Sequence, residues 1–182
     1  MKNANPVSRR YGLIAWLLAA VWLTGCGRAE PAAETPLGAD HHFTINVGEK
    51  PVEMQLAIAP PEMMRGLMER GLLGRHEGML FVYTKPQQMS FWMRNTPNPL
   101  DIGFFDAEGV LREVYQMYPY DETAVKSRRT DLQYALEMNQ GWFAATGVKI
   151  GDKLDLAAVA AGVKARGFPL RGFLGLSEAA AK

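Results

Sequence analysis

Two acidic residues, Asp101 and Glu137, each stand within an apolar run of strand length, and they are the first candidates for chemistry. Strand alternation turns each acid away from its apolar neighbours, so we expect the two carboxylates to share one face of a sheet. Two carboxylates at a suitable separation can cleave a glycosidic bond, one as the acid and the other as the base or nucleophile.

The same acids have a simpler interpretation as members of ion pairs. A half-buried carboxylate strongly needs a partner. Arg94 is a candidate partner for Asp101, while Arg65 or Arg70 is a candidate for Glu137. Because structural ion pairs often imitate catalytic sites, we favour this interpretation and predict no catalytic residue.

Arginine, tryptophan and amide side chains near these acids favour a binding site. A guanidinium group grips a carboxylate or phosphate through two hydrogen bonds, and an indole face stacks on a sugar or packs on an alkyl chain. We therefore expect a concave site for a small anionic or glycan-like ligand, formed by Arg65, Arg70, Trp92, Arg94, Asn95, Asp101 and Glu137. For Trp92 alone a core position is favoured, and Asn95 has an alternative role as side-chain anchor of its proline-rich turn.

No motif for another kind of catalysis stands out. The sequence has no glycine-rich phosphate loop and no metallopeptidase helix, and its serines lack the setting of a nucleophile. His76 lies in a polar stretch, where we expect it to be solvated. The ten methionines offer thioethers to Cu(I), yet their positions on apolar faces favour core packing. We predict no cofactor and no metal.

The N-terminus has the features of an export signal. Three basic residues precede an apolar run over 11–23, which is too short to span a membrane and has the length of a signal-peptide core. The run ends in Leu23-Thr24-Gly25-Cys26, which resembles the lipobox of bacterial lipoproteins. That resemblance implies cleavage before Cys26 and attachment of acyl chains such as palmitate, which anchor the protein stably because two or more chains are present.

The residue after the cysteine is Gly27, not Asp. In a Gram-negative cell, the resemblance to sorted lipoproteins then implies the periplasmic face of the outer membrane. We therefore expect a protein of the cell envelope with the membrane as one partner, and with no protein partner that the sequence identifies.

Charge and cysteine content exclude several classes of function. The formal net charge of the 182 residues is +1; the leader holds three of the 20 basic residues and no acid, so 17 basic and 19 acidic residues remain and the charge becomes −2. Nucleic-acid binding, which needs a dense basic footprint, is not expected. The single cysteine excludes internal disulfides and zinc sites built on paired thiolates.

Short alternating apolar runs predict a mainly β body. Residues 43–47 and 52–58 flank a tight turn and predict a hairpin, as do residues 100–104 and 110–117. A short helix is expected over 62–70. Further strands are expected at 78–83, 89–94 and 134–138.

These elements indicate one compact all-β domain of the sandwich or barrel-like kind, with one or two short helices. We divide the chain into a lipoprotein signal peptide (1–25), a lipid-anchored flexible tether (26–42), the β-rich domain (43–156) and a C-terminal helix and tail (157–182). The Gly- and Ala-rich tail is expected to be mobile or lightly docked.

The chain contains several ordered motifs: Met64-Arg65-Gly66-Leu67-Met68-Glu69-Arg70, Gly78-Met79-Leu80-Phe81, Phe91-Trp92-Met93-Arg94-Asn95-Thr96 and Pro99-Leu100-Asp101-Ile102, followed by Phe104-Phe105-Asp106, Tyr134-Ala135-Leu136-Glu137 and Gly151-Asp152. Together these motifs resemble one known family, domain of unknown function 192 (DUF192). The resemblance covers residues 43–156 and implies a small β-rich fold, often exported, with no assigned reaction.

We therefore predict a lipid-anchored periplasmic binding module without a catalytic role. One alternative is an enzyme that acts on envelope glycans through Asp101 and Glu137. Another is a structural or assembly partner in the envelope that uses the same surface.

Overall fold

The structure is a computed structural model that describes residues 35–176. The predicted leader and Cys26 lie outside the described residues. The elements are β1 (His42–Val47), β2 (Lys50–Ala57), α1 (Pro60–Arg65), β3 (Glu77–Gln87), β4 (Ser90–Phe91), β5 (Leu100–Asp106), β6 (Leu111–Met117), β7 (Val125–Lys126), β8 (Leu132–Asn139), α2 (Trp142–Thr146), α3 (Leu156–Ala165) and the 3-10 helix η1 (Leu170–Gly172).

Six strands form one sheet in the order β1-β2-β3-β8-β5-β6, and β4 pairs with β7 in a second sheet of two strands. The predicted mainly β single domain is confirmed. Both predicted hairpins form, because β1 pairs with β2 and β5 pairs with β6 in antiparallel register. One pairing was not predicted: β2 and β3 run parallel, with α1 in the connection between them.

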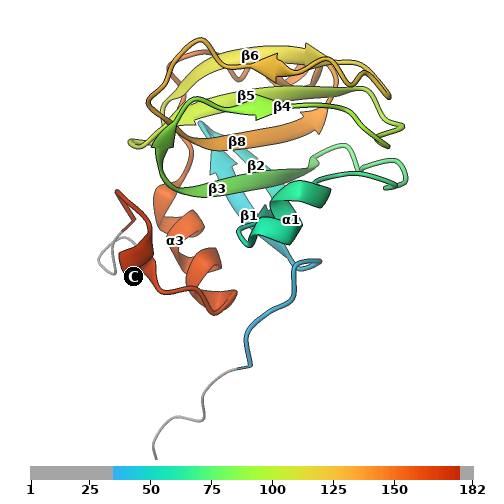
Figure 1. Cartoon of the computed structure of the whole chain (residues 1–182). Helices are drawn as coiled ribbons and strands as arrows, with labels where there is room; N and C mark the ends of the chain where they lie inside the picture. Colours follow the sequence, from blue (N-terminus) through green and yellow to red (C-terminus); the bar gives the residue numbers. More distant parts are fainter. Residues whose placement is uncertain (1–34, 177–182) are drawn as a thin grey trace, which may run out of the picture. The chain divides into compact units, whose positions relative to one another are not determined.

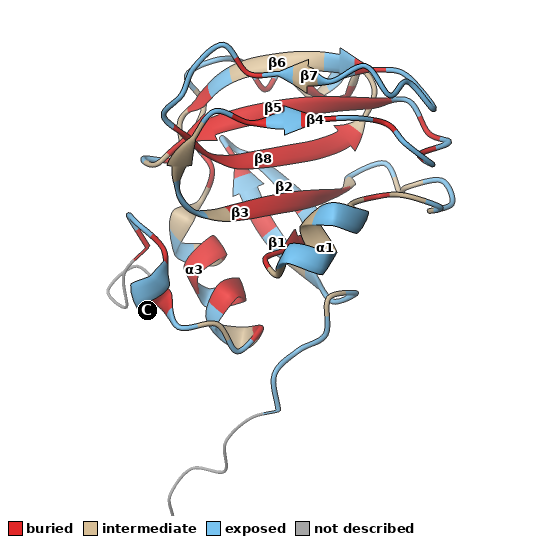
Figure 2. Ribbon diagram, in the orientation of Figure 1, coloured by how far each residue is buried: buried red, intermediate tan, exposed pale blue. Residues whose placement is uncertain are grey.

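The large sheet has two covered faces. One face packs against α2, α3 and η1 through a core that includes Leu80, Leu136 and Val159. The other face, which includes Phe81, Ile102 and Ala135, is covered by the α1 loop and the segment around β4. Figure 2 shows β5 and β8 buried along most of their length and α1 largely exposed.

The C-terminal segment is an integral part of the core. Val159 and Val163 of α3 are fully buried, and Leu170, Phe173 and Leu176 are almost as deeply buried. α3 packs next to β1 (Figure 1). The expectation of a mobile or lightly docked tail therefore does not hold for the described residues up to 176, because these apolar side chains cover one face of the sheet.

The end of the predicted tether also contacts the domain. The backbone N–H of Leu37 donates to the carbonyl of Ala165 at 2.9 Å, and Nε of Arg166 donates to the carbonyl of Leu37 at 3.0 Å. The described end of the tether, residues 35–42, therefore contacts the folded domain. Any flexible part of the tether thus ends before the predicted boundary at residue 42.

Three loops meet at one end of the large sheet (Figure 1). They follow α1, β4 and β6, and each contains a non-glycine residue with positive φ: Glu69 (57°), Asn95 (52°) and Tyr120 (60°). Backbone hydrogen bonds join them, from Glu69 N–H to the Asn95 carbonyl at 2.8 Å and from Tyr120 N–H to the Thr96 carbonyl at 3.1 Å. This three-loop end is thus held together by its main chain in conformations that cost energy for residues other than glycine.

Candidate functional site

A small pocket of about 240 Å³ lies beside α1, where the chain leaves β2 and where β3 passes below. Pro60 and Pro61 start the helix, because their fixed φ suits the first turn, and Gly66 ends it at a φ of 50°. The pocket is lined by Ala39, Asp40, Leu56, Ala57, Pro61, Glu62, Arg65, Gly66, Arg70 and Met79. It brings Arg65 and Arg70, two of the predicted binding residues, to one place.

Glu137 does not line this pocket but lies next to two residues that do. Its cross-strand partner is Met79, a lining residue, and a Cβ added to Gly66 would lie 3.9 Å from Glu137 Oε2. A Cβ at Gly66 would also come within 3.3 Å of the Phe81 ring. The absence of a side chain at position 66 therefore lets the helix end approach the buried carboxyl group.

The Glu137 carboxyl group is buried without a partner. The residue is 4% exposed, and within residues 35–176 no hydrogen bond or ion pair reaches its side chain. Burial disfavours the charged form and raises the pKa of Glu137 to about 8. The group is therefore largely protonated at neutral pH and has an O–H to donate.

The two arginines of the pocket retain unused hydrogen-bond donors. Arg65 is exposed, and its side chain makes no hydrogen bond or ion pair in the described part of the chain. Arg70 donates from Nη2 to Asp40 Oδ1 at 3.1 Å, whereas its Nε is buried with no acceptor. A buried N–H without an acceptor is costly, so a ligand oxygen at this position would satisfy it.

Glu62 anchors the opposite wall of the pocket. Its Oε2 accepts from the N–H groups of Ile58 and Ala59, both at 2.9 Å, and its Oε1 accepts from Arg166. Burial alone would raise the pKa of Glu62, but these N–H groups and the guanidinium outweigh it and hold the pKa below its usual value. Glu62 thus stays charged and paired, in contrast to Glu137.

The predicted ion pairs of the two acids are wrong. Among the described residues Glu137 has no pair with Arg65 or Arg70, and Asp101 has none with Arg94. The expected common face is wrong too: Glu137 pairs across with Ile102, while Asp101 pairs with Met138, so the acids point to opposite faces of the sheet. Each acid does point away from its flanking residues, but Ile102 and Leu136 themselves lie on different faces.

Asp101 stabilises the junction between β8 and α2. Its Oδ2 accepts from the N–H of Gly141 at 2.8 Å, and Oδ1 is buried without a partner. Burial raises the pKa of Asp101, and the bond from Gly141 lowers it only in part. The residue therefore belongs to the face opposite the pocket over Glu137.

The remaining predicted residues, Trp92, Arg94 and Asn95, belong to the three-loop end. Trp92 is 44% exposed, so the core position favoured for it is wrong; the Arg94 guanidinium lies 5.5 Å from its ring centroid. The turn is not anchored by the Asn95 side chain. Asn98 does this instead, donating to the carbonyls of Gly71 at 2.7 Å and Arg70 at 3.3 Å.

Asn98 was missed by the sequence analysis, although it stands in the same Asn-Thr-Pro-Asn-Pro stretch. Asn139 acts in the same way and donates to the carbonyl of Gly74 at 2.9 Å. Together they fix the loop between α1 and β3 and hence the position of Arg70. The available signal was the preference of asparagine for hydrogen bonds to nearby main chain, but the distant loop it binds was not evident.

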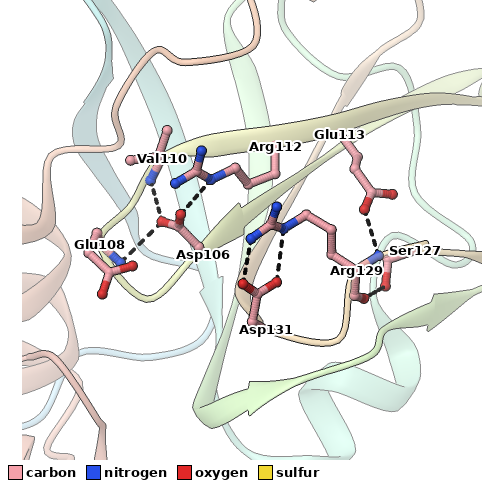
Figure 3. Close-up of polar contacts among 8 residues, drawn as sticks. All are labelled: Asp106, Glu108, Val110, Arg112, Glu113, Ser127, Arg129 and Asp131. Atoms are coloured by element: carbon pink, nitrogen blue, oxygen red, sulfur yellow. Dashed lines mark hydrogen bonds and ion pairs between the residues drawn. The ribbon is translucent and has the colours of Figure 1, made fainter.

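A second polar cluster was also missed (Figure 3). Asp106 Oδ1 accepts from the N–H groups of Glu108 at 3.1 Å and Val110 at 2.8 Å, and Oδ2 pairs with Arg112. In the segment between β7 and β8, Arg129 pairs with Asp131 at the surface. The cluster fixes the β5–β6 turn, and nothing in it points to a ligand.

Metal-binding groups do not gather in the described part of the chain. Within residues 35–176 no three His, Cys, Asp or Glu side chains are placed to hold a metal ion. Met54, Met79, Met89, Met93, Met117 and Met138 are buried and pack within the two cores. In the same residues no helix is long and apolar enough to cross a membrane.

The fold and the pocket define a mainly β domain with a small pocket beside its first helix. Residues 43–156 match the model of the DUF192 family, described as "Uncharacterized ACR", and the chain belongs to this family. No curated protein shows a significant similarity to the chain.

Two solved structures are similar to the chain. A protein of unknown function from Novosphingobium aromaticivorans DSM 12444 has 34% sequence identity and a TM-score of 0.60, with 69% of this chain and 94% of that one covered. A protein from Sinorhizobium meliloti 1021, provisionally named a transcription regulator, has 28% identity and a TM-score of 0.60, with 67% and 96% covered.

Proposed function

We propose that the protein is a binding module of the cell envelope that holds a small anionic ligand, such as an acidic sugar, in the pocket over Glu137. The observation that supports this most is the set of unused donors at one pocket. The Arg65 guanidinium and Arg70 Nε have no acceptor within residues 35–176, and the protonated Glu137 lies next to Gly66 and Met79 of the same pocket.

The size and lining of the pocket favour a small ligand. Its volume of about 240 Å³ is below the ~300–1,000 Å³ of pockets for drug-sized molecules. Guanidinium groups suit a carboxylate of the ligand, and a neutral carboxyl group suits a hydroxyl. The apolar side chains of Leu56 and Met79 suit the carbon face of a sugar ring.

A glycan-cleaving enzyme is less favoured, because the two carboxyl groups that it would use are not placed as a pair. Such enzymes place two carboxyl groups on either side of the bond to be cleaved, about 5–10 Å apart and open to the same cleft. Asp101 and Glu137 lie on opposite faces of the sheet. They therefore have no common cleft in which a glycosidic bond would lie between them.

The name of the Sinorhizobium protein raises regulation of transcription as another role. The charge of this chain gives it little support, because 17 basic residues face 19 acidic residues once the leader is removed. DNA binding rests mainly on neutralising phosphates with a basic surface.

Binding is tested by calorimetric titration of the full-length chain in detergent with glucuronate and galacturonate, and with glucose as the neutral counterpart. We expect the acids to bind and Arg65→Gln to raise their Kd about tenfold, as for the loss of one charge-assisted hydrogen bond. Arg171→Gln is the matched control, because Arg171 is an exposed arginine of η1 that does not line the pocket. No binding, or equal Kd values for the two variants, would contradict the proposal.

The anchor is tested separately by fractionating bacterial cells that express the chain. The lipobox-like sequence at Cys26 leads us to expect the protein in the membrane fraction and labelled by radioactive palmitate. Cys26→Ala should abolish the label. An unlabelled wild-type protein would remove the lipid anchor from the proposal and leave the ligand site unaffected.

A further inference from the structure

A second, larger pocket of about 610 Å³ lies on a different part of the domain. It is formed where the β1–β2 turn, the residues before β3 and the start of α2 come together. The residues that supply its chemistry are Lys50, Arg75, His76 and Trp142. None of them lines the pocket over Glu137.

The lining of this pocket carries positive charge without acidic residues. Lys50 and Arg75 are exposed, and neither makes a hydrogen bond or ion pair through its side chain in residues 35–176. Asp101 is buried and accepts the N–H of Gly141, a lining residue, and it does not line the pocket itself. Two cations therefore face the same space with their donors unused.

Trp142 fixes the orientation and tautomer of His76. The indole Nε1 of Trp142, a residue only 4% exposed, donates to His76 Nδ1 at 3.2 Å. An indole N–H only donates, so Nδ1 acts as the acceptor and the ring proton of the neutral imidazole is on Nε2. The backbone of His76 is fixed as well, because its carbonyl accepts from Glu53 N–H at 2.9 Å.

The neighbouring amides do not compete for a ligand. The Asn139 side-chain nitrogen donates to the loop carbonyls of residues 73 and 74, and that of Gln140 donates to the carbonyl of Met117. The unused donors are thus those of Lys50, Arg75 and His76 Nε2. Two charged hydrogen-bond donors and one neutral N–H around the same pocket suit the oxygens of an anion.

We propose that this pocket binds a small oxyanion, such as the phosphoryl or carboxylate group of a solute, between Lys50, Arg75 and His76 Nε2. Trp142 holds the imidazole in place from below and is a positioning residue. This site is independent of the proposed acidic-sugar pocket, since it uses other residues and another part of the fold.

The indole N–H of Trp142 is a specific reporter for the test. The full-length chain in detergent is labelled with ¹⁵N and titrated with inorganic phosphate or acetate at constant ionic strength, with NaCl as the compensating salt. We expect a saturable shift of the Trp142 indole resonance, because the ligand contacts the imidazole to which it donates. The Trp92 indole resonance, at the three-loop end, should not move. Whether phosphate or acetate saturates first identifies the preferred group.

Substitutions then separate this site from general salt effects. Lys50→Ala and Arg75→Ala should each raise the apparent Kd about tenfold, in line with loss of a charge-assisted bond. Lys126→Ala, a change at an exposed lysine of β7, should leave it unchanged. A Trp142 shift that does not saturate, or that persists equally in Lys50→Ala and Arg75→Ala, would overturn the proposal.

Discussion

A carboxyl group among methionine and phenylalanine side chains behaves differently from one that is paired. Glu62 lines the small pocket beside α1 and Glu137 lies behind its wall, and their pKa values move in opposite directions. The cause is the presence of N–H groups and a guanidinium around Glu62 and their absence around Glu137 within the described residues. One neutral and one charged carboxyl group therefore lie close to the same pocket at neutral pH.

This difference predicts a pH-dependent effect of Glu137→Gln. In the unfolded chain the Glu137 pKa is near its ordinary ~4.3, while in the folded protein it is about 8. Between these values the folded protein holds a proton that the unfolded chain has released, so the stability of the wild type falls as pH rises across this window. Glutamine does not titrate in this range. The free energy of unfolding of the variant should therefore rise relative to that of the wild type, on the order of several kcal/mol, from pH 4.5 to pH 8.5.

The measurement is urea unfolding of both proteins at several pH values in that range. Glu122→Gln is the matched control, because Glu122 is exposed in the loop after β6. A difference between Glu137→Gln and the wild type that stays constant with pH would contradict the raised pKa of Glu137.

At the scale of single residues, sequence reasoning found where acids and arginines occur but not how they pair. It placed Arg65, Arg70 and Glu137 in one site; in the structure Arg65 and Arg70 line one pocket, and Glu137 lies next to Gly66 in its wall. It failed for Asp101. Alternation shows which residues of one strand share a face, but it does not show which of these residues lie on the same side of the sheet as those of the neighbouring strand. That relation depends on the pairing register of β5 with β8.

Turns and caps define the elements, and the β5–β6 turn depends on one aspartate. Asp106 is 3% exposed and satisfies two backbone N–H groups while pairing with Arg112 (Figure 3). An N–H group left without an acceptor in a buried turn destabilises the fold. The hairpin therefore relies on this side chain as well as on its cross-strand pairs.

We expect Asp106→Ala to lower the free energy of unfolding by about 2–4 kcal/mol, because it leaves two N–H groups and one guanidinium without their partner. Asp131→Ala removes an ion pair of similar composition, but Asp131 and Arg129 are both about half exposed. That variant should leave the free energy of unfolding close to the wild-type value, because exposed ion pairs contribute little. Urea unfolding measures both, and equal losses would contradict the role given to Asp106.

The hairpins could be predicted, because alternating runs on both sides of a glycine turn are a local signal. Two features were not local. The parallel pairing of β2 with β3 requires a crossover through α1, and the stretch 89–94 forms only the two-residue strand β4. Its apolar side chains Met89, Phe91 and Met93 cover the sheet instead of extending it.

At the scale of the whole molecule, the fold extends beyond the family match. The match ends at residue 156, yet α3 and η1 complete the core. The sequence alone indicated a helix there, but Ala- and Gly-rich composition gave no sign of where its apolar face would pack. That contact is made with strands more than 100 residues earlier in the chain.

We expect a chain that ends at residue 156 to lose cooperative folding. It would lack the buried side chains of Val159, Val163, Leu170, Phe173 and Leu176. Their burial is worth on the order of 10 kcal/mol, which equals the whole stability of a typical domain. Thermal unfolding followed by circular dichroism checks this, with a chain ending at 176 as the control. Similar cooperative transitions in both chains would contradict it.

Arg166 joins parts of the chain that are far apart in sequence. Its guanidinium donates to the carbonyls of Leu37 and Leu56 and to the Glu62 side chain, across separations of 129, 110 and 104 residues. When the chain emerges N-terminus first from a ribosome or a translocation channel, these hydrogen bonds therefore cannot form before residue 166 has emerged. The native state therefore forms late in biosynthesis. For most of that time the polypeptide stays unfolded and can pass through a narrow channel.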